Sequence, residues 1–98
     1  MVVLRWTVEA ADTFEAIAEY IATDSPFYAK LFAIDVMAAI ERLKDFPLSG
    51  RMVPERGNPK FRELLCGSYR IIYRVEVELV QILMVHHTSR LLDPADLK

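Results

Sequence analysis

The strongest constraint on the fold is the alternation of side chains in "YRIIYRVE", residues 69–76. Successive side chains of an extended chain point to opposite faces, so two faces of different character are predicted. One face carries Tyr69, Ile71, Tyr73 and Val75, and the other carries Arg70, Ile72, Arg74 and Glu76. Apolar runs at 61–66 and 79–87 flank this stretch, and Gly67-Ser68 suits a tight turn. The pattern predicts three consecutive strands, although no glycine or asparagine marks the second turn near Val77-Glu78.

Two helices are predicted before these strands, over residues 9–22 and 26–45. Each has an apolar stripe at helical spacing; the stripes are Ala10, Phe14, Ile17, Ala18 and Ile21, and then Ala29, Phe32, Ala33, Val36, Ile40 and Leu43. Ser25 is suited to cap the second helix, Pro26 to its first turn, and Pro47 to end it. A short link predicts an antiparallel hairpin. Apolar residues off the second stripe (Leu31, Ile34 and Met37) suggest that this helix is covered on more than one side.

The remaining segments complete an α+β domain. Residues 2–6, "VVLRW", are a short strand candidate, and residues 47–60 hold three prolines and two glycines and are expected to form an irregular loop. The predicted order is βααβββ, an N-terminal helical hairpin packed on a small, mostly antiparallel sheet. With 98 residues, of which 53% are hydrophobic, we expect a single domain over 1–98 with one core.

Charge is distributed unevenly along the chain, whose net charge is −2. Residues 1–50 carry four basic and eight acidic side chains, whereas residues 51–74 carry six basic and two acidic ones. An acidic total with a basic middle favours a local anionic contact over non-specific duplex binding. The one cysteine, Cys66, cannot form an internal disulfide, and neither a signal peptide nor a membrane span is indicated. We therefore expect a cytoplasmic protein.

In "PLSGRMVPE" (47–55), "FRELLCGSYRIIYRV" (61–75) and "ILMVHHTSR" (82–90), behind a helical hairpin, the chain resembles the RelE/ParE superfamily of bacterial type II toxin–antitoxin toxins. This resemblance implies a toxin neutralised by a cognate antitoxin, which typically wraps an extended or helical segment around it. Contact with DNA is then expected only through that complex. RelE-like members cleave mRNA in the ribosomal A site, and ParE-like members inhibit DNA gyrase. No cofactor is implied.

The RelE-like pattern is only half matched. Arg70 and Arg90 fall on its two arginines, but its basic pair falls on Phe61 and Glu63, and the tail 91–98 has neither tyrosine nor histidine. RNA cleavage needs a base, an acid and cations, and each group contributes roughly 10²–10⁴-fold. We therefore favour a ParE-like gyrase inhibitor. A nuclease using Arg70 and Arg90, with Glu63 or His87 as the base, and a decayed toxin that only holds its antitoxin are the alternatives.

The candidate target-binding residues are Arg51, Arg62, Arg70 and Arg90. Several also have a structural interpretation: Arg70 and Arg74 could solvate the outer sheet face and pair with Glu63 or Glu76 across strands, and Arg51 could pair with Glu55 to hold its loop. His86 and His87 are adjacent on a strand and point to opposite faces, so no metal site is predicted. The aromatic residues are expected in the core and hairpin (Trp6, Phe14, Tyr20, Phe27 and Phe32), and any that are exposed would mark an antitoxin contact.

Overall fold

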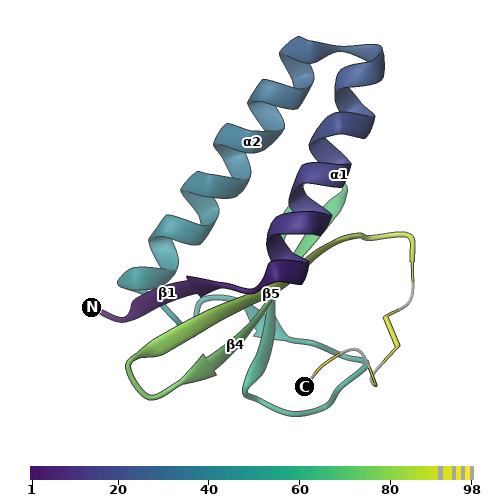
Figure 1. Ribbon diagram of the computed structural model, residues 1–98. Coiled ribbons are helices and arrows are strands. Elements are labelled where there is room, and N and C mark those ends of the chain that lie inside the picture. The colour runs from purple at the N-terminus through teal and green to yellow at the C-terminus, as the bar shows by residue number, and fades with distance from the viewer. Residues whose placement is uncertain (91, 94, 96, 98) are drawn as a thin grey trace.

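The computed structural model describes residues 1–90, 92, 93, 95 and 97, and Leu91, Pro94, Asp96 and Lys98 of the predicted domain lie outside the described residues. Its elements are β1 (Val3–Trp6), α1 (Val8–Asp24), α2 (Pro26–Glu41), a 3₁₀ turn (Arg42–Lys44), β2 (Arg51–Met52), β3 (Phe61–Cys66), β4 (Tyr69–Glu76) and β5 (Leu79–His87). The two helices pack on one face of the sheet (Figure 1). The predicted α+β class is confirmed.

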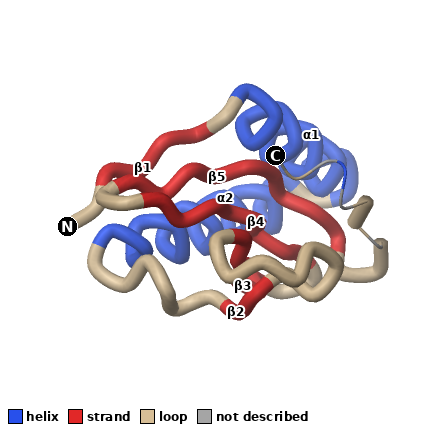
Figure 2. The backbone as a smooth tube through the Cα atoms, turned by 90° about the horizontal axis from the view of Figure 1, so that it is seen from below, coloured by secondary structure: helices blue, strands red, loops and turns tan. Residues whose placement is uncertain are grey.

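The sheet has five strands in the order β1-β5-β4-β3-β2, and the helices lie behind it in Figure 2. β1 runs parallel to β5, and the other neighbours are antiparallel. Strand β2 was not predicted, because Arg51 and Met52 lie in the segment 47–60 that we expected to be irregular. A two-residue strand has no sequence period, so its pairing with Arg62 and Glu63 is fixed only by the fold.

A single residue, Ser25, joins the two helices. It ends α1 with its backbone N–H on the carbonyl of Ile21, and its hydroxyl accepts from the backbone N–H of Tyr28 at 3.2 Å. The predicted cap at Ser25 and the position of Pro26 in the first turn are therefore confirmed. Thr7 caps α1 in the same way and donates to the carbonyls of Ile82 and Leu83 in β5, which fixes the start of the hairpin on the sheet.

Both tight turns between strands occur where the chain takes up a left-handed conformation. Gly67, with a φ of 59°, confirms the predicted turn between β3 and β4. In the turn between β4 and β5 the residue with positive φ is Glu78, at 60°. The sequence could not place this second turn, because the position is not occupied by a glycine or asparagine that would mark it.

Each face of the sheet has its own apolar cluster. Ile71 and Tyr73 of β4 pack toward the helices, with Tyr69 and Val75 partly buried against the same cluster, as the alternation predicted. The opposite cluster contains Val53, Phe61, Ile72, Leu83, Met84, Leu92 and Leu97. A register shift opposite Ile72 and Tyr73 lets the neighbouring residues Leu83 and Met84 both join this cluster. The second cluster, with two residues from the C-terminal tail, was not predicted.

The helical hairpin leaves apolar side chains uncovered. Leu31, Ile34 and Met37 of α2 are exposed, so the expected second cover of this helix is wrong for the described residues. Tyr20 and Phe27, expected in the core, are exposed as well. The end of the hairpin, where α1 meets α2, extends beyond the sheet (Figure 1). The other aromatic side chains confirm the prediction and pack together (Trp6, Phe14 and Phe32). Neither helix in the described part of the chain is long and apolar enough to cross a membrane.

Candidate functional site

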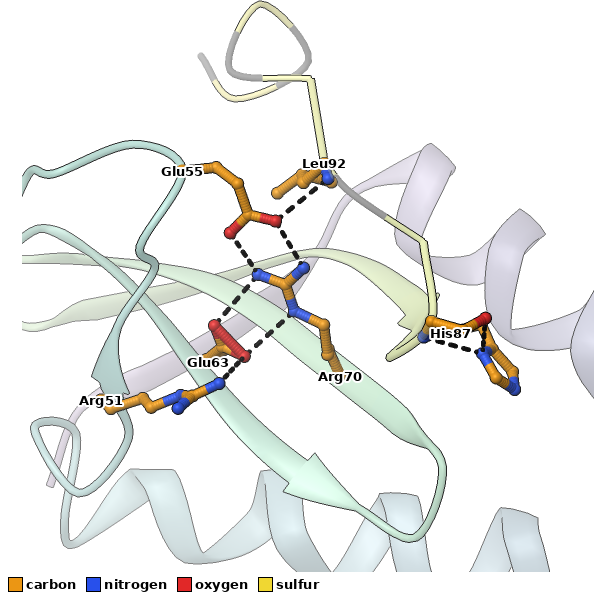
Figure 3. A network of polar contacts seen from close by, with 7 residues as sticks. Arg51, Glu55, Glu63, Arg70, His87 and Leu92 are labelled. Atoms are coloured by element: carbon orange, nitrogen blue, oxygen red, sulfur yellow. Dashed lines mark hydrogen bonds and ion pairs between the residues drawn. The ribbon is translucent and has the colours of Figure 1, made fainter.

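Arg70, the second residue of β4, lies at the centre of a buried ion network. Its Nε and Nη2 each donate to the carboxylate of Glu63 at 3.0 Å, and its Nη1 and Nη2 each donate to the carboxylate of Glu55 at 2.8 Å. Figure 3 shows the guanidinium between the two acids. Such two-pronged pairs are the strongest charge-assisted hydrogen bonds. Only 6% of Arg70 is exposed, so it does not solvate the outer face as one interpretation of the sequence proposed.

Glu55 joins this network to the C-terminal tail. Its Oε2 also accepts from the backbone N–H of Leu92 at 3.0 Å, and Leu92 is buried in the outer cluster. The hydrogen bonds from Arg70, opposed by burial and helped by the Leu92 N–H, lower the pKa of Glu55 to about 2. The same pairing raises the pKa of Arg70, so both groups are charged at neutral pH. Through Arg70 and Glu55, the network therefore ties β4 to β3, to the loop after β2 and to the tail.

Arg51 extends the network toward solvent. Its Nη2 lies 3.4 Å from Oε2 of Glu63, while 63% of its side chain remains exposed. Arg51 is directly opposite Glu63 in the pairing of β2 with β3, so the two side chains share a face. The predicted pairing of Arg51 with Glu55 is wrong, because Glu55 binds Arg70 and the register brings Glu63 to Arg51.

Arg62, the second residue of β3, has a different environment and contacts the loop that precedes this strand. Its Nε donates to the carbonyl of Pro59 at 3.0 Å, and its Nη1 donates to the carbonyl of Gly50 at 2.9 Å. The hydroxyl of Tyr73 holds the same loop, since it accepts from the N–H of Gly50 and donates to the carbonyl of Pro47. The guanidinium of Arg62 thus contacts the segment before its own strand, and its role in target binding stays a prediction.

Arg70 and Arg90, the two arginines that match the superfamily pattern, line one hollow. We call this feature, of about 480 Å³, the arginine hollow; its lining residues are Arg51, Pro54, Glu55, Leu65, Arg70, Thr88 and Arg90. Arg70 forms its buried floor, and the exposed side chains of Arg51 and Arg90 approach from β2 and from the segment after β5. Glu55, Leu65 and Thr88 were not among the predicted site residues, although each lies in one of the three segments that carry the resemblance (47–55, 61–75 and 82–90).

His87 belongs to a second hollow, of about 540 Å³, between α1 and the end of β5. Its Nδ1 accepts from the backbone N–H of Ser89 at 3.0 Å. Its ring packs edge to face with the ring of Tyr69, with the two ring centroids 5.2 Å apart. These contacts agree with a packing and hydrogen-bonding role. Within the described residues, no group of three His, Cys, Asp or Glu side chains is placed to hold a metal ion.

The structure does not assemble the groups that an improvised nuclease would need. Glu63, a possible base, is fully buried and accepts hydrogen bonds from Arg70 and Arg51. His87, the other possible base, lines a hollow to which neither Glu63 nor Arg70 contributes. Phe61 is buried in the outer cluster. Arg90 lines both hollows and so lies near His87, but Arg70 and Glu63 do not line the hollow of His87, so the two arginines and a free base do not share one site.

The cross-strand pair of Arg70 with Glu63 is one of the interpretations that the sequence offered, and it is confirmed. Arg74 instead contacts Glu76 of its own strand, at 3.0 Å between Nε and Oε1. Cys66, beside the turn after β3, is half-buried, and burial raises the pKa of its thiol. A raised pKa disfavours the thiolate, so a nucleophilic role for Cys66 gains no support.

Comparison with known proteins agrees with the family resemblance of the sequence. A family model described as "ParE toxin of type II toxin-antitoxin system, parDE" matches residues 4–92. The curated protein "Putative toxin Y4kP" of Sinorhizobium fredii is 32% identical over 87 residues, which are 85% of this chain and 88% of that protein.

Two solved structures share the fold. A chain of the structure titled "Chromosomal ParDE TA system from P. aeruginosa" superposes with a TM-score of 0.72 at 26% identity, covering 89% of this chain and 96% of that one. A chain of the RelBE2 toxin–antitoxin complex from Mycobacterium tuberculosis has a TM-score of 0.61 at 24% identity, covering 88% and 96%. At that identity the second likeness concerns the fold alone.

Proposed function

Because the chain belongs to the ParE toxin family of type II toxin–antitoxin systems, we propose that it inhibits DNA gyrase by binding, without cleaving RNA. The observation that carries this proposal is the closed ion network around Arg70. The arginine and Glu63, which an RNA-cleaving site would use, are bound to each other and to Glu55. At the arginine hollow, the guanidinium groups of Arg51 and Arg90 remain accessible and are suited to binding.

The chemistry of RNA cleavage supports the same choice. Attack by a 2′-hydroxyl requires a base within hydrogen-bond reach, usually a group whose pKa lies near the working pH. Glu63 is enclosed by two arginines, and Glu55 has a pKa of about 2. A carboxylate with a pKa as low as that of Glu55 is a poor proton acceptor at neutral pH. The oxygens of Glu63 already accept hydrogen bonds from Arg70 and Arg51.

Two assays on the purified chain test this function. We expect inhibition of supercoiling by DNA gyrase, with an increase in cleaved DNA, and intact mRNA when translating ribosomes are incubated with the chain. Primer extension would detect any A-site cuts. Cut mRNA together with unaffected gyrase would refute the proposal and favour the nuclease, above all if the cuts disappear in Arg90→Ala, since Arg90 is exposed and forms no part of the buried network.

We further propose that a cognate antitoxin covers the outer side of the helical hairpin. Phe27, Leu31 and Ile34 lie on one side of α2, because their spacings are four and three residues, and all three are exposed. The adjacent helix α1 carries five exposed acids and no basic residue over Val8–Asp24. An amphipathic antitoxin helix with an apolar stripe and flanking Lys or Arg fits this surface.

Substitution on this stripe tests the contact. Leu31→Asp and Ile34→Asp should each weaken antitoxin binding about 30-fold or more, since buried interface anchors contribute about 2 kcal/mol or more. Val77→Asp is the matched control, because Val77 is a highly exposed apolar residue in the β4–β5 turn, outside the helical hairpin. Titration calorimetry measures the affinities, and equal loss in all three variants would contradict this assignment.

A further inference from the structure

We infer that the arginine hollow binds one carboxylate of a protein target, held by Arg51 and Arg90. This inference rests on the proposed function, and it adds the chemical class of the group that the target presents. It also separates the three arginines of the hollow into two that make contact and one that positions its surroundings.

Arg70 is the positioning residue. A guanidinium has five N–H donors, and four hydrogen bonds from Arg70 go to Glu55 and Glu63. Its side chain is almost completely buried. Arg70 therefore has almost no N–H donor left for a ligand that enters the hollow.

The two rim arginines are available. Arg51 makes one long contact, 3.4 Å to Glu63, and most of its side chain is exposed. Arg90 is exposed, and its guanidinium forms no ion pair with any residue that the structure describes. Because they approach the hollow from β2 and from beyond β5, they can grip a ligand from two sides. Guanidinium groups bind carboxylates in planar, two-pronged pairs.

The charge of the site favours one negative charge over many. Three arginines and the carboxylates of Glu55 and Glu63 leave a single positive charge uncompensated. A nucleic acid would bring a series of closely spaced phosphates, and Glu55 and Glu63 would repel them. The net charge of the whole chain, −2, would add to this repulsion. One carboxylate neutralises the site without that repulsion.

The rest of the lining suits an amino-acid side chain. Leu65 is 59% exposed and lies opposite Arg70 in the pairing of β3 with β4, and Pro54 adds a second apolar surface. Thr88 supplies a hydroxyl. An Asp or Glu side chain on a partly apolar protein surface can contact the arginines, the apolar residues and the hydroxyl of this lining.

Cross-linking with a carbodiimide identifies the chemistry directly, because this reagent joins an amine to a carboxylate in contact with it. In the Arg90→Lys and Arg51→Lys variants, incubated with purified gyrase, we expect an amide to an Asp or Glu of gyrase, located by mass spectrometry. Arg5→Lys is the control, since Arg5 is exposed on β1 at the opposite edge of the sheet. The yield at the hollow should exceed that of the control at least ~10-fold, as a close ion pair requires.

Loss of charge gives the second measurement. Arg51→Gln and Arg90→Gln should each raise the concentration needed for half-inhibition of gyrase about 10-fold, a typical effect of losing one interfacial charge pair, while Arg5→Gln leaves it unchanged. Circular dichroism of each variant confirms folding.

The outcomes separate this inference from the proposed function. If the unsubstituted chain does not inhibit gyrase, the proposed function fails and this inference fails with it. If it inhibits gyrase but neither the cross-link nor the loss of inhibition in the Gln variants is found, only this inference is overturned. Binding of a phosphodiester oligonucleotide that Arg90→Gln abolishes, measured by fluorescence anisotropy, would overturn it in favour of phosphate.

Discussion

The two faces of this molecule keep their shape by different means. On the helix side, apolar side chains fill the space between sheet and hairpin, and the outward side of α2 is left apolar and uncovered. On the other side, a smaller apolar cluster is joined to an ion network that ties β3, the loop after β2 and the tail to Arg70. The first face has apolar surface to offer a partner, and the second offers charge held in a fixed position.

This contrast matters for function because a charged site must hold its geometry in water. Exposed ion pairs alone contribute little, typically about 0–1 kcal/mol, whereas Arg70 and Glu63 are buried and mutually satisfied. Apolar contacts need no such scaffold, since a helix already presents Phe27, Leu31 and Ile34 on one side. The comparison predicts large effects for substitutions inside the network and small ones on the outer side of α2.

Removal of Arg70 should have the largest effect. Arg70→Met leaves Glu63 buried without its main partner, and breaking a buried pair costs about 3–5 kcal/mol. Urea denaturation should show this loss in the free energy of unfolding. Arg5→Met, on an exposed edge strand, is the control and should change little. A loss below about 1 kcal/mol for Arg70→Met would mean that the network does not hold the outer face together.

Replacement of Glu55 should have an intermediate effect that depends on pH. Glu55→Gln removes charge-assisted hydrogen bonds of a type that contributes about 1.5–3 kcal/mol. The folded pKa of Glu55, about 2, lies below the ordinary 4.5, so its stabilisation is complete above pH 4.5 and is lost as pH falls toward 2. Denaturation curves across this range should converge for the two proteins. Parallel curves would show that another group causes the acid dependence.

The smallest effect is expected on the outer side of α2. Ile34→Ala should change the free energy of unfolding by no more than about 0.5 kcal/mol, because more than half of Ile34 is already exposed. Ile40→Ala, the same substitution at a buried position of the same helix, should cost about 2–5 kcal/mol. Similar losses at both positions would show that the outer side of α2 is covered in solution.

Much of the fold follows from local patterns. Alternation in β4 indicated which side chains face the helices, Ser25 and Pro26 marked the junction of the hairpin, and Gly67 marked a turn. These features depend on neighbours within a few residues, because the backbone geometry of strands, helices and tight turns repeats from one protein to another. The short strand β2 and the turn at Glu78 were less accessible, because the first is too short to show a period and the second lacks the usual turn residue.

The candidate site was predicted only in part. The motif indicated Arg70 and Arg90, and both line the arginine hollow. The pairing of Arg70 with Glu63 was one interpretation that the sequence offered, but the sequence could not show that Glu55 also binds Arg70, since Glu55 lies 15 positions away in an irregular loop. It also could not show that Leu92 of the tail would donate to the same carboxylate.

The sequence by itself determined the order of the elements other than the two-residue β2, most of the inward faces of helices and strands, and the family, because each of these depends on spacing or on contiguous motifs. Only the tertiary structure decided which charges meet. A guanidinium binds whichever carboxylates the packed chain brings within about 3 Å, and that proximity is set by strand register and loop path. For this reason Arg70 holds the outer face together while Arg51 and Arg90 remain available at its rim.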